Sequence, residues 1–292
     1  MALSTPGQPA QGILLLYLGL TLLSLNGLFA KLIPLDAFSM TQMRSVIAIG
    51  GFFLFCRAYK VPLRVSNARH LAGIYVLGLV MGVHWGTFFH AMQISTVAVG
   101  ILALFSYPMI TILLEPLFTH RRLEIRDLIS GILVMFGLLI MVWQDLGLGL
   151  SGNILQGAAW GVLSALLFSL RNLCQKYFFA AIPSGTLMFH QLVAIALLFL
   201  PFVNLSATRS LNGQDWLLLV MLGLLGTAAA HTLYTVSLKV LAAKTVSLVG
   251  CMQPVVSILL AWVIIQEAPS LAVVIGGSII LLVAIAESVI RY

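Results

Sequence analysis

Charged residues are scarce in this chain of 292 residues: Asp, Glu, Lys and Arg together make up 8% of it, whereas 61% of the residues are hydrophobic. Soluble domains carry roughly 25% charged residues, so a water-soluble fold of this length could not cover its apolar surface with so few charges. The composition therefore excludes a soluble globular protein and indicates a protein whose solvent is lipid. The 15 Lys and Arg against 8 Asp and Glu would suggest nucleic-acid binding in a soluble protein, but their positions give another explanation below.

Cysteines and catalytic motifs are scarce as well. The three cysteines, Cys56, Cys174 and Cys251, lie in apolar stretches without a Cys-x-x-Cys spacing, which predicts buried packing residues and neither a zinc site nor a disulfide framework. The sequence has no phosphate-binding glycine loop followed by Lys, no metal-spaced His and Glu cluster and no Gly-x-Ser-x-Gly turn. We therefore expect no enzyme, no metal and no cofactor, with an intramembrane enzyme or a channel as the alternatives.

Long apolar runs are what the sequence has in abundance. A membrane-spanning helix needs about 20 apolar residues, and breaks at charges, prolines and polar clusters divide the chain into ten candidate spans. They are residues 12–33, 37–56, 70–92, 95–118, 124–143, 151–175, 183–204, 214–238, 241–263 and 268–290. The expected fold class is therefore an all-α integral membrane protein with ten transmembrane helices, preceded by a short N-terminal tail.

One apolar phrase occurs twice. Residues 108–114 read PMITILL and residues 254–260 read PVVSILL. Each proline lies well inside an apolar run, where it removes a backbone hydrogen bond and clashes with the preceding turn. A membrane helix tolerates such a proline where neighbouring helices or a lined cavity satisfy the freed carbonyl. The phrase therefore predicts two interrupted membrane helices.

The repeated phrase divides the chain into two repeats of five helices, residues 12–145 and 151–290. Because five is odd, the second repeat enters the membrane from the opposite side, so we expect inverted repeats. Interrupted helices at matching places of inverted repeats are typical of the central site of secondary transporters.

The distribution of the basic residues predicts the orientation. With the N-terminus in the cytoplasm, the outer side carries only Lys31 and Arg209. The inner side then carries Arg57, Lys60, Arg64, Arg69, Arg121, Arg122, Arg126, Lys176, Lys239, Lys244 and Arg291. An excess of basic residues marks the cytoplasmic loops of membrane proteins. We therefore expect a multi-pass protein of the cell (inner) membrane with both termini in the cytoplasm, and no nucleic-acid partner.

The turns after the interrupted helices carry a resemblance. Each Pro-containing fourth helix is followed by a polar turn, His120-Arg121-Arg122 in one half and Gln266-Glu267-Ala268-Pro269 in the other, and by a fifth helix with glycine. This pattern resembles the EamA units of the drug/metabolite transporter superfamily. Residues 262–267 are similar to the family's turn ending in Glu, whereas the first half has Arg121 at that place. The resemblance implies a carrier, often an exporter of amino acids or related metabolites, that works by alternating access.

Two hydrogen-bonding side chains precede the repeated prolines. Tyr107 shares a helical face with Thr111, and Gln253 shares the matching face with Ser257. We predict that Tyr107 and Gln253 line a substrate-binding site. The alternatives are a packing aromatic for Tyr107 and an interhelical hydrogen bond for Gln253.

The third and eighth spans each carry a histidine near mid-span, and these are His84, followed by Trp85, and His231, which shares a face with Tyr234. An imidazole at this depth can take up a proton or bind a carboxylate, and the aromatic rings can cover an apolar substrate group. We include all four residues in the predicted site, with hydrogen-bonded packing as the alternative.

The sixth span carries Arg171 on one face with Trp160 and Ser164. A guanidinium there could hold a substrate carboxylate in a two-point contact, so all three residues join the predicted site. For Arg44, in the second span, snorkelling to the headgroups or an ion pair is favoured, and whether Arg44 and His190 line the cavity stays open. No carboxylate lies clearly at mid-span, and Glu115 and Glu287 lie near the inner ends of their spans, so proton coupling and uniport both remain open.

The aromatic and cationic residues of the predicted site suit a zwitterionic or anionic small molecule with an apolar part. We therefore expect a monomeric exporter of amino acids or amino-acid-derived metabolites. Uptake or exchange of another organic anion, such as a nucleotide-like or cofactor-like solute or a carboxylate-rich metal chelator, is the alternative.

Overall fold

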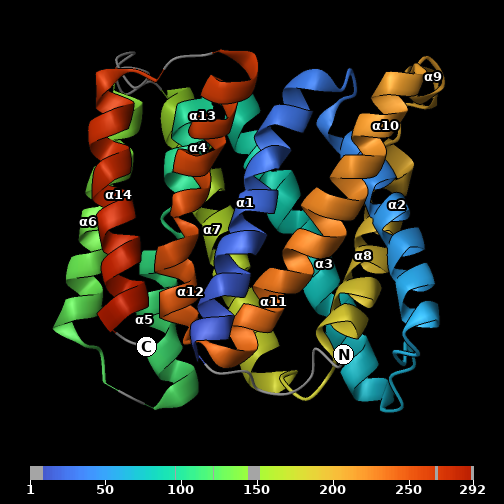
Figure 1. Cartoon of the computed structure of the whole chain (residues 1–292), viewed down its shortest axis with the longest axis horizontal. Coiled ribbons are helices and arrows are strands. Elements are labelled where there is room, and N and C mark those ends of the chain that lie inside the picture. Colours follow the sequence, from blue (N-terminus) through green and yellow to red (C-terminus); the bar gives the residue numbers. More distant parts are fainter. Residues whose placement is uncertain (1–8, 96, 121, 144–151, 267–268, 291–292) are drawn as a thin grey trace. The chain divides into compact units, whose positions relative to one another are not determined.

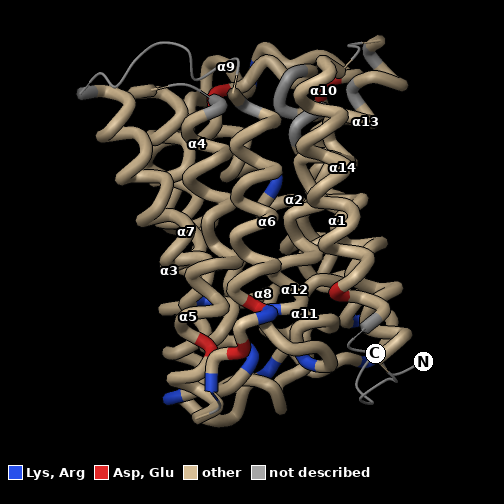
Figure 2. Tube along the Cα trace, turned by 90° about the vertical axis from the view of Figure 1, so that its left-hand side faces the viewer, with Lys and Arg blue, Asp and Glu red and all other residues tan. Residues whose placement is uncertain are grey.

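The computed structural model describes residues 9–95, 97–120, 122–143, 152–266 and 269–290, and the regular elements in this part of the chain are all helices (Figure 1). Arg121, Glu267 and Arg291, which carry part of the orientation and turn arguments, lie outside the described residues. Most described Lys and Arg residues lie near the ends of the helices, and the middles of the helices are almost free of charge (Figure 2). This distribution is what a lipid environment requires of spanning helices.

Nine described helical segments are long and apolar enough to cross a membrane. They comprise α1 (Pro9–Leu32), α2 (Ala37–Ala58), α3 (Ala68–Ile94), α4 with α5 (Val97–Leu104, Tyr107–Thr119), α7 (Gly152–Phe178), α8 (Ser184–Phe199), α10 with η3 and α11 (Gly213–Met221, Leu222–Ala229, Ala230–Val240), α12 with α13 (Ala243–Gly250, Met252–Ile265) and α14 (Leu271–Ile290). The 18-residue helix α6 (Ile125–Val142) occupies the remaining expected span. The prediction of an all-helical membrane protein is confirmed. Between α8 and α10 lie the short helices η2 (Leu200–Phe202) and α9 (Leu205–Arg209).

Both interruptions predicted from the repeated prolines are present. α4 ends at Leu104, and α5 begins at Tyr107 with Pro108 in its first turn. α12 ends at Gly250, and α13 begins two residues later with Pro254 as its third residue. Proline is tolerated in the first turn because the N–H that it lacks would have no intrahelical partner there. The prolines thus start new helices instead of kinking continuous ones.

The boundaries around the two interruptions repeat with the sequence. Four boundaries in the second set follow their counterparts in the first by 146 residues: α4 and α12 begin at 97 and 243 and end at 104 and 250, α5 and α13 end at 119 and 265, and α6 and α14 begin at 125 and 271. The starts of α5 and α13, at 107 and 252, differ by 145. The residues after α5 and α13, His120 and Gln266, both adopt the left-handed conformation, with φ of 54° and 58°. The repeated sequence therefore encodes a repeated local structure.

Glycines also mediate equivalent helix contacts in the two halves. A Cβ atom added to Gly131 of α6 would lie 3.0 Å from Met109 Cε of α5. One added to Gly277 of α14 would lie 3.2 Å from Val255 Cγ1 of α13. Small residues at such places allow membrane helices to approach closely.

The helices pack into two compact units that do not follow the sequence repeats. Unit 1 takes its described residues from 1–82 and 179–240, and unit 2 takes its described residues from 83–178 and 241–292. Each unit therefore combines helices from both halves of the sequence, and α3 contributes its first part to unit 1 and its last part to unit 2.

Unit 1 is organised around α2, which packs against α8 and η3, and α1, which packs against α11 and η3. In η3 the hydroxyl of Thr227 donates to Leu222 O, five residues back, at 2.9 Å, which fits the wider turn of a π-helix. Gly223 in the same segment faces α2, where a Cβ would meet Ile47 Cγ2 at 2.7 Å. The wide turn and this glycine together allow η3 to lie close to α2.

Unit 2 has its tightest helix pair in α6 and α14, which run side by side (Figure 1). A Cβ on Gly137 of α6 would lie 2.9 Å from the backbone oxygen of Gly276 on α14, and one on Gly276 would lie 2.7 Å from Met141 Cγ. The apolar core beside this contact includes Leu138 and Ile280, both almost completely buried. The backbones themselves define the spacing here, because neither glycine leaves room for a side chain.

The substitution Gly276→Ala tests this packing. Its methyl group would overlap Gly137 O and Met141, and overpacking of this kind costs about 1–3 kcal/mol. We expect the variant to show a clearly lower thermal midpoint in detergent. Gly50→Ala on α2 is the matched control because a Cβ there would meet nothing within 4 Å, and equal midpoints for the two variants would contradict the packing.

Candidate functional site

The two interruptions contact each other inside unit 2. Tyr107, directly before Pro108, donates from its hydroxyl to Ser247 O of α12 at 3.1 Å. The same hydroxyl lies against Gly250, the last residue of α12, so closely that no Cβ could be accommodated there. Tyr107 is 4% exposed. Tyr107, the first residue of α5, is therefore packed against Gly250, the last residue of α12.

An aromatic series continues from Tyr107. Its ring meets the ring of Phe168 on α7 edge to face, with 5.0 Å between centroids, and Phe168 stacks on the imidazole of His84 at 4.8 Å. His84 lies in the part of α3 that belongs to unit 2. Aromatic pairs at these separations have favourable quadrupole interactions. The predicted site residues Tyr107 and His84 are thus joined through Phe168.

The hydrogen bonds of His84 define its tautomer. Its Nδ1 lies 3.0 Å from Ser164 O and 2.7 Å from Ser164 Oγ, while the hydroxyl of Ser164 donates to His84 O at 2.8 Å. A carbonyl oxygen only accepts, and the Ser164 hydroxyl has already used its single hydrogen, so we infer that Nδ1 carries the proton. In the neutral ring Nε2 is then a hydrogen-bond acceptor.

Hydroxyl groups satisfy the backbone at the first interruption. Ser169 Oγ of α7 donates to Tyr107 O at 2.9 Å, and Thr111 Oγ1 lies 2.8 Å from the same oxygen. Ser106 Oγ donates to Ala103 O at 2.7 Å. Lipid offers no hydrogen bonds, so side chains of this kind stabilise irregular backbone at membrane depth.

Arg171 lies on α7, within a buried polar stretch. It is 1% exposed, as are the adjacent Asn172 and Gln175 one turn further. Its Nη1 donates to Asn172 Oδ1 at 2.9 Å. Arg171 lies seven residues before the end of α7, about 10 Å along the helix axis. A side chain that snorkelled from this depth to the headgroups would be exposed along its length, so the burial shows that Arg171 points into the protein.

The structure brings some predicted site residues together and leaves others apart. His84 is hydrogen-bonded to Ser164 and is linked to Tyr107 through the ring of Phe168. Trp160, on the same helix as Ser164, is 40% exposed and packs edge to face on His90 at 5.2 Å. The other predicted residues of unit 2 are Arg171, Trp85, which is 7% exposed, and Gln253, which is half-buried. Unit 1 contains His231 and Tyr234, which lie on α11 and are 7% and 3% exposed.

The two residues left open by the sequence, Arg44 and His190, both belong to unit 1. Arg44 is 8% exposed on the side of α2 that faces η3, where Gly223 lies near Arg44 O. His190 is half-buried, and its Nε2 lies 2.8 Å from Leu63 O in the loop before α3. That contact gives His190 a role in holding a loop.

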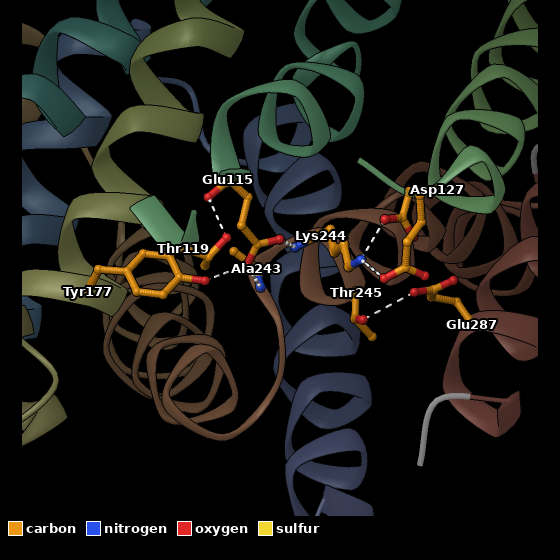
Figure 3. A network of polar contacts seen from close by, with 9 residues as sticks. Glu115, Thr119, Asp127, Tyr177, Ala243, Lys244, Thr245 and Glu287 are labelled. Atoms are coloured by element: carbon orange, nitrogen blue, oxygen red, sulfur yellow. Dashed lines mark hydrogen bonds and ion pairs between the residues drawn. The ribbon is translucent and has the colours of Figure 1, made fainter. Parts of the chain in front are cut away.

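A carboxylate that the sequence places only near a helix end proves to be a helix cap. Glu115 of α5 is 5% exposed and accepts hydrogen bonds from Ala243 N at 2.9 Å, Lys244 N at 3.0 Å and the Tyr177 hydroxyl at 2.6 Å (Figure 3). The first N–H groups of a helix lack partners within it, and a negative charge there is favoured by the helix dipole. The sequence signal for this role is Ala242, which precedes α12 without a capping side chain.

A second set of charges surrounds the same helix start. Lys244 Nζ lies 2.5 Å from Asp127 Oδ2 and 3.2 Å from Glu124 Oε1, and Thr245 donates to Glu287 Oε1 at 3.1 Å (Figure 3). These contacts join α6 and α14 to α12. The carboxylates of unit 2 in this region are thus engaged in fixing the start of the interrupted helix.

Two interrupted helices within an all-helical membrane fold, with a buried cation and hydroxyl-lined backbone beside them, define an integral membrane carrier. Residues 10–143 and 155–286 each match the EamA-like transporter family, and the chain belongs to that family. It is 22% identical over 272 residues to the uncharacterized transporter YxxF of Bacillus subtilis (strain 168), covering 92% of this chain and 86% of YxxF.

The fold recurs in a solved structure entitled "Crystal structure of protein", which superimposes with a TM-score of 0.84 at 19% sequence identity. The match covers 97% of this chain and 98% of the other. The family expectation drawn from the repeated proline phrase and the polar turns is confirmed, and the protein is a membrane transporter and not an enzyme.

Glu115→Gln tests the cap on α12. The neutral amide loses the charge that the helix dipole favours, and its NH₂ group opposes backbone N–H groups that also donate. Leaving buried donors unsatisfied costs about 1–3 kcal/mol, so we expect a lower thermal midpoint in detergent. Glu124→Gln is the control because the Glu124 side chain is 62% exposed, and exposed ion pairs contribute roughly 0–1 kcal/mol. A drop as large in the control would contradict the capping role.

Proposed function

We propose that this transporter exports amino acids or amino-acid-derived metabolites across the cell membrane by alternating access. The observation that carries the proposal is Arg171, a guanidinium that is 1% exposed within a membrane-spanning helix. A charged side chain inside a spanning helix is costly, and Arg residues there are rare. Such residues are retained in transporters where they meet a substrate or a compensating group.

The chemistry of Arg171 favours a carboxylate substrate. Its planar fork of donors matches the two oxygens of a carboxylate, and Asn172, which accepts from Nη1, is an uncharged amide. We therefore assign Arg171 to the carboxylate of an amino acid or a related acid.

The aromatic series supports a zwitterion with an apolar part. The Nε2 atom of neutral His84 is an acceptor that suits an ammonium group, and Phe168 and Tyr107 offer apolar ring surface beside it. Trp85, Ser164 and Gln253 complete the proposed substrate site in unit 2, together with Trp160 at its more exposed end. His231 and Tyr234, which belong to unit 1, stay predictions from the sequence.

The sequence features that favour this cargo also admit another organic anion, namely a nucleotide-like or cofactor-like solute or a carboxylate-rich metal chelator. Several negative charges would need several cations, and Arg171 is the single Lys or Arg of unit 2 that is buried to this degree among the described residues. A substrate with one carboxylate therefore fits better. The proposal includes inverted five-helix repeats, a monomer and both termini in the cytoplasm.

Transport assays test the cargo. Proteoliposomes are loaded with the twenty common amino acids, and efflux is followed by mass spectrometry against protein-free vesicles. Metabolite profiles of the medium from cells with and without the protein extend the search to derivatives. The proposal predicts efflux of at least one amino acid or derivative, and the absence of any change in both assays would overturn it.

Arg171→Ala tests the carboxylate contact. Charged hydrogen bonds contribute about 1.5–3 kcal/mol, so we expect transport of the identified substrate at subsaturating concentration to fall by about 10- to 100-fold. Its alcohol analogue, which lacks the carboxylate, should be affected far less. Arg171→Lys is the matched control because it keeps the charge and loses the two-point fork, and it should lie between Arg171→Ala and the unaltered protein. Equal losses for acid and alcohol would remove Arg171 from the site.

A further inference from the structure

We propose that residues 57–70 of unit 1, which cover the end of α2, the link to α3 and the start of α3, are a docking surface for the phosphate groups of anionic phospholipids. This segment, the basic segment, carries the cations Arg57, Lys60, Arg64 and Arg69 and no acidic residue. All four are exposed. Clusters of four or more cations directly beside a membrane helix attract anionic lipid headgroups.

The carboxylates of unit 1 are engaged elsewhere. Asp36 accepts from Phe38 N and Ser39 N at the start of α2, and Asp215 accepts from Asn212 N at the start of α10. The described residues of unit 1 contain no other acidic side chain. By contrast, Lys244 of unit 2 is paired with two carboxylates. The basic segment therefore presents positive charge that the described part of its own unit does not neutralise.

The basic segment is held in a defined shape by α8. Thr186 Oγ1 donates to Pro62 O at 2.9 Å, and His190 Nε2 lies 2.8 Å from Leu63 O. At the far end, Asn67 Oδ1 accepts from Arg69 N at 2.9 Å and begins α3. A loop held at both places presents its cations without the ordering cost that a flexible tail would pay on binding.

Aromatic residues place the segment at headgroup depth. Phe55 and Tyr59, at the end of α2, have ring centroids 4.6 Å apart, and Tyr59 is 65% exposed. Leu54 beside them is 68% exposed, as a lipid-facing residue is. Amphipathic aromatic rings concentrate at the membrane–water interface. The cations that follow Tyr59 along the chain are therefore level with lipid phosphates, which favours a lipid over a soluble anion or a protein partner.

Lys60 adds a second observation. Its φ of 54° lies in the left-handed region, at the position after α2 where helices commonly place glycine. A lysine there bears a conformational cost that glycine avoids. Strained backbone conformations cluster at functional sites, and at Lys60 the side chain offers a cation beside the phosphate layer.

The test is native mass spectrometry of the purified full-length protein in detergent, titrated with phosphatidylglycerol or phosphatidylcholine. The variant Lys60→Gly with Arg64→Gln removes two charges while relieving the backbone at residue 60. The matched control, Arg122→Gln with Arg126→Gln, removes two charges around the start of α6, where the acidic residues Glu124 and Asp127 also lie. Thermal midpoints of both variants verify that they are folded.

We expect the unaltered protein to prefer phosphatidylglycerol, with an affinity that falls as salt is raised. Each interfacial cation contributes about fivefold, so the basic-segment variant should lose roughly 20- to 30-fold in phosphatidylglycerol binding, and the control should change by less than about threefold. Inorganic phosphate at millimolar concentration should not displace the lipid. Equal binding of both lipids, equal losses in the two variants, or displacement by phosphate would overturn the proposal.

Discussion

The structure depends on the fact that lipid satisfies no backbone hydrogen bonds, so each broken membrane helix needs polar partners supplied by its neighbours. Here the chain breaks two spans with prolines, and both breaks belong to unit 2. The hydroxyl groups of Ser169 and Thr111 donate to the carbonyl oxygen of Tyr107. The hydroxyl of Tyr107 in turn donates to Ser247 O on the other interrupted helix. The interruptions therefore stabilise each other, and Gly250 is the residue whose small size permits their contact.

The same constraint accounts for the roles of the acidic residues near the start of α12. Glu115 accepts hydrogen bonds from the first backbone N–H groups of α12, and Lys244 forms an ion pair with Asp127 of α6, so these carboxylates have structural roles. Arg171 on α7 is buried, and its Nη1 donates to the amide oxygen of Asn172. The acidic groups of this region thus fix the broken helices, and the guanidinium of Arg171 is the reason for proposing a cargo with a carboxylate and hence amino-acid export.

Much of the fold could be predicted from the sequence, because apolar runs of membrane length and a repeated proline phrase are local signals. The breaks before Pro108 and Pro254 fall where the phrase places them. The site was harder to predict, since helical spacing groups residues by face and does not show which helix covers that face. Trp160 shares a face with Ser164, yet it lies nearer the helix end and is exposed. The cap by Glu115 and the grouping of helices from both repeats into each unit depend on contacts between distant residues, which the sequence pattern does not contain.

The contact between the two interruptions can be measured most directly with a double-mutant cycle over Tyr107→Phe and Gly250→Ala, read as free energy of unfolding in detergent. The added methyl and the hydroxyl compete for one space, so the account predicts that Gly250→Ala costs at least about 1 kcal/mol less when the hydroxyl is absent, a coupling typical of residues in contact. Gly86→Ala, whose Cβ would meet nothing within 4 Å, should show no such coupling. Additivity of Tyr107→Phe and Gly250→Ala within about 0.3–0.5 kcal/mol would contradict the contact on which the account rests.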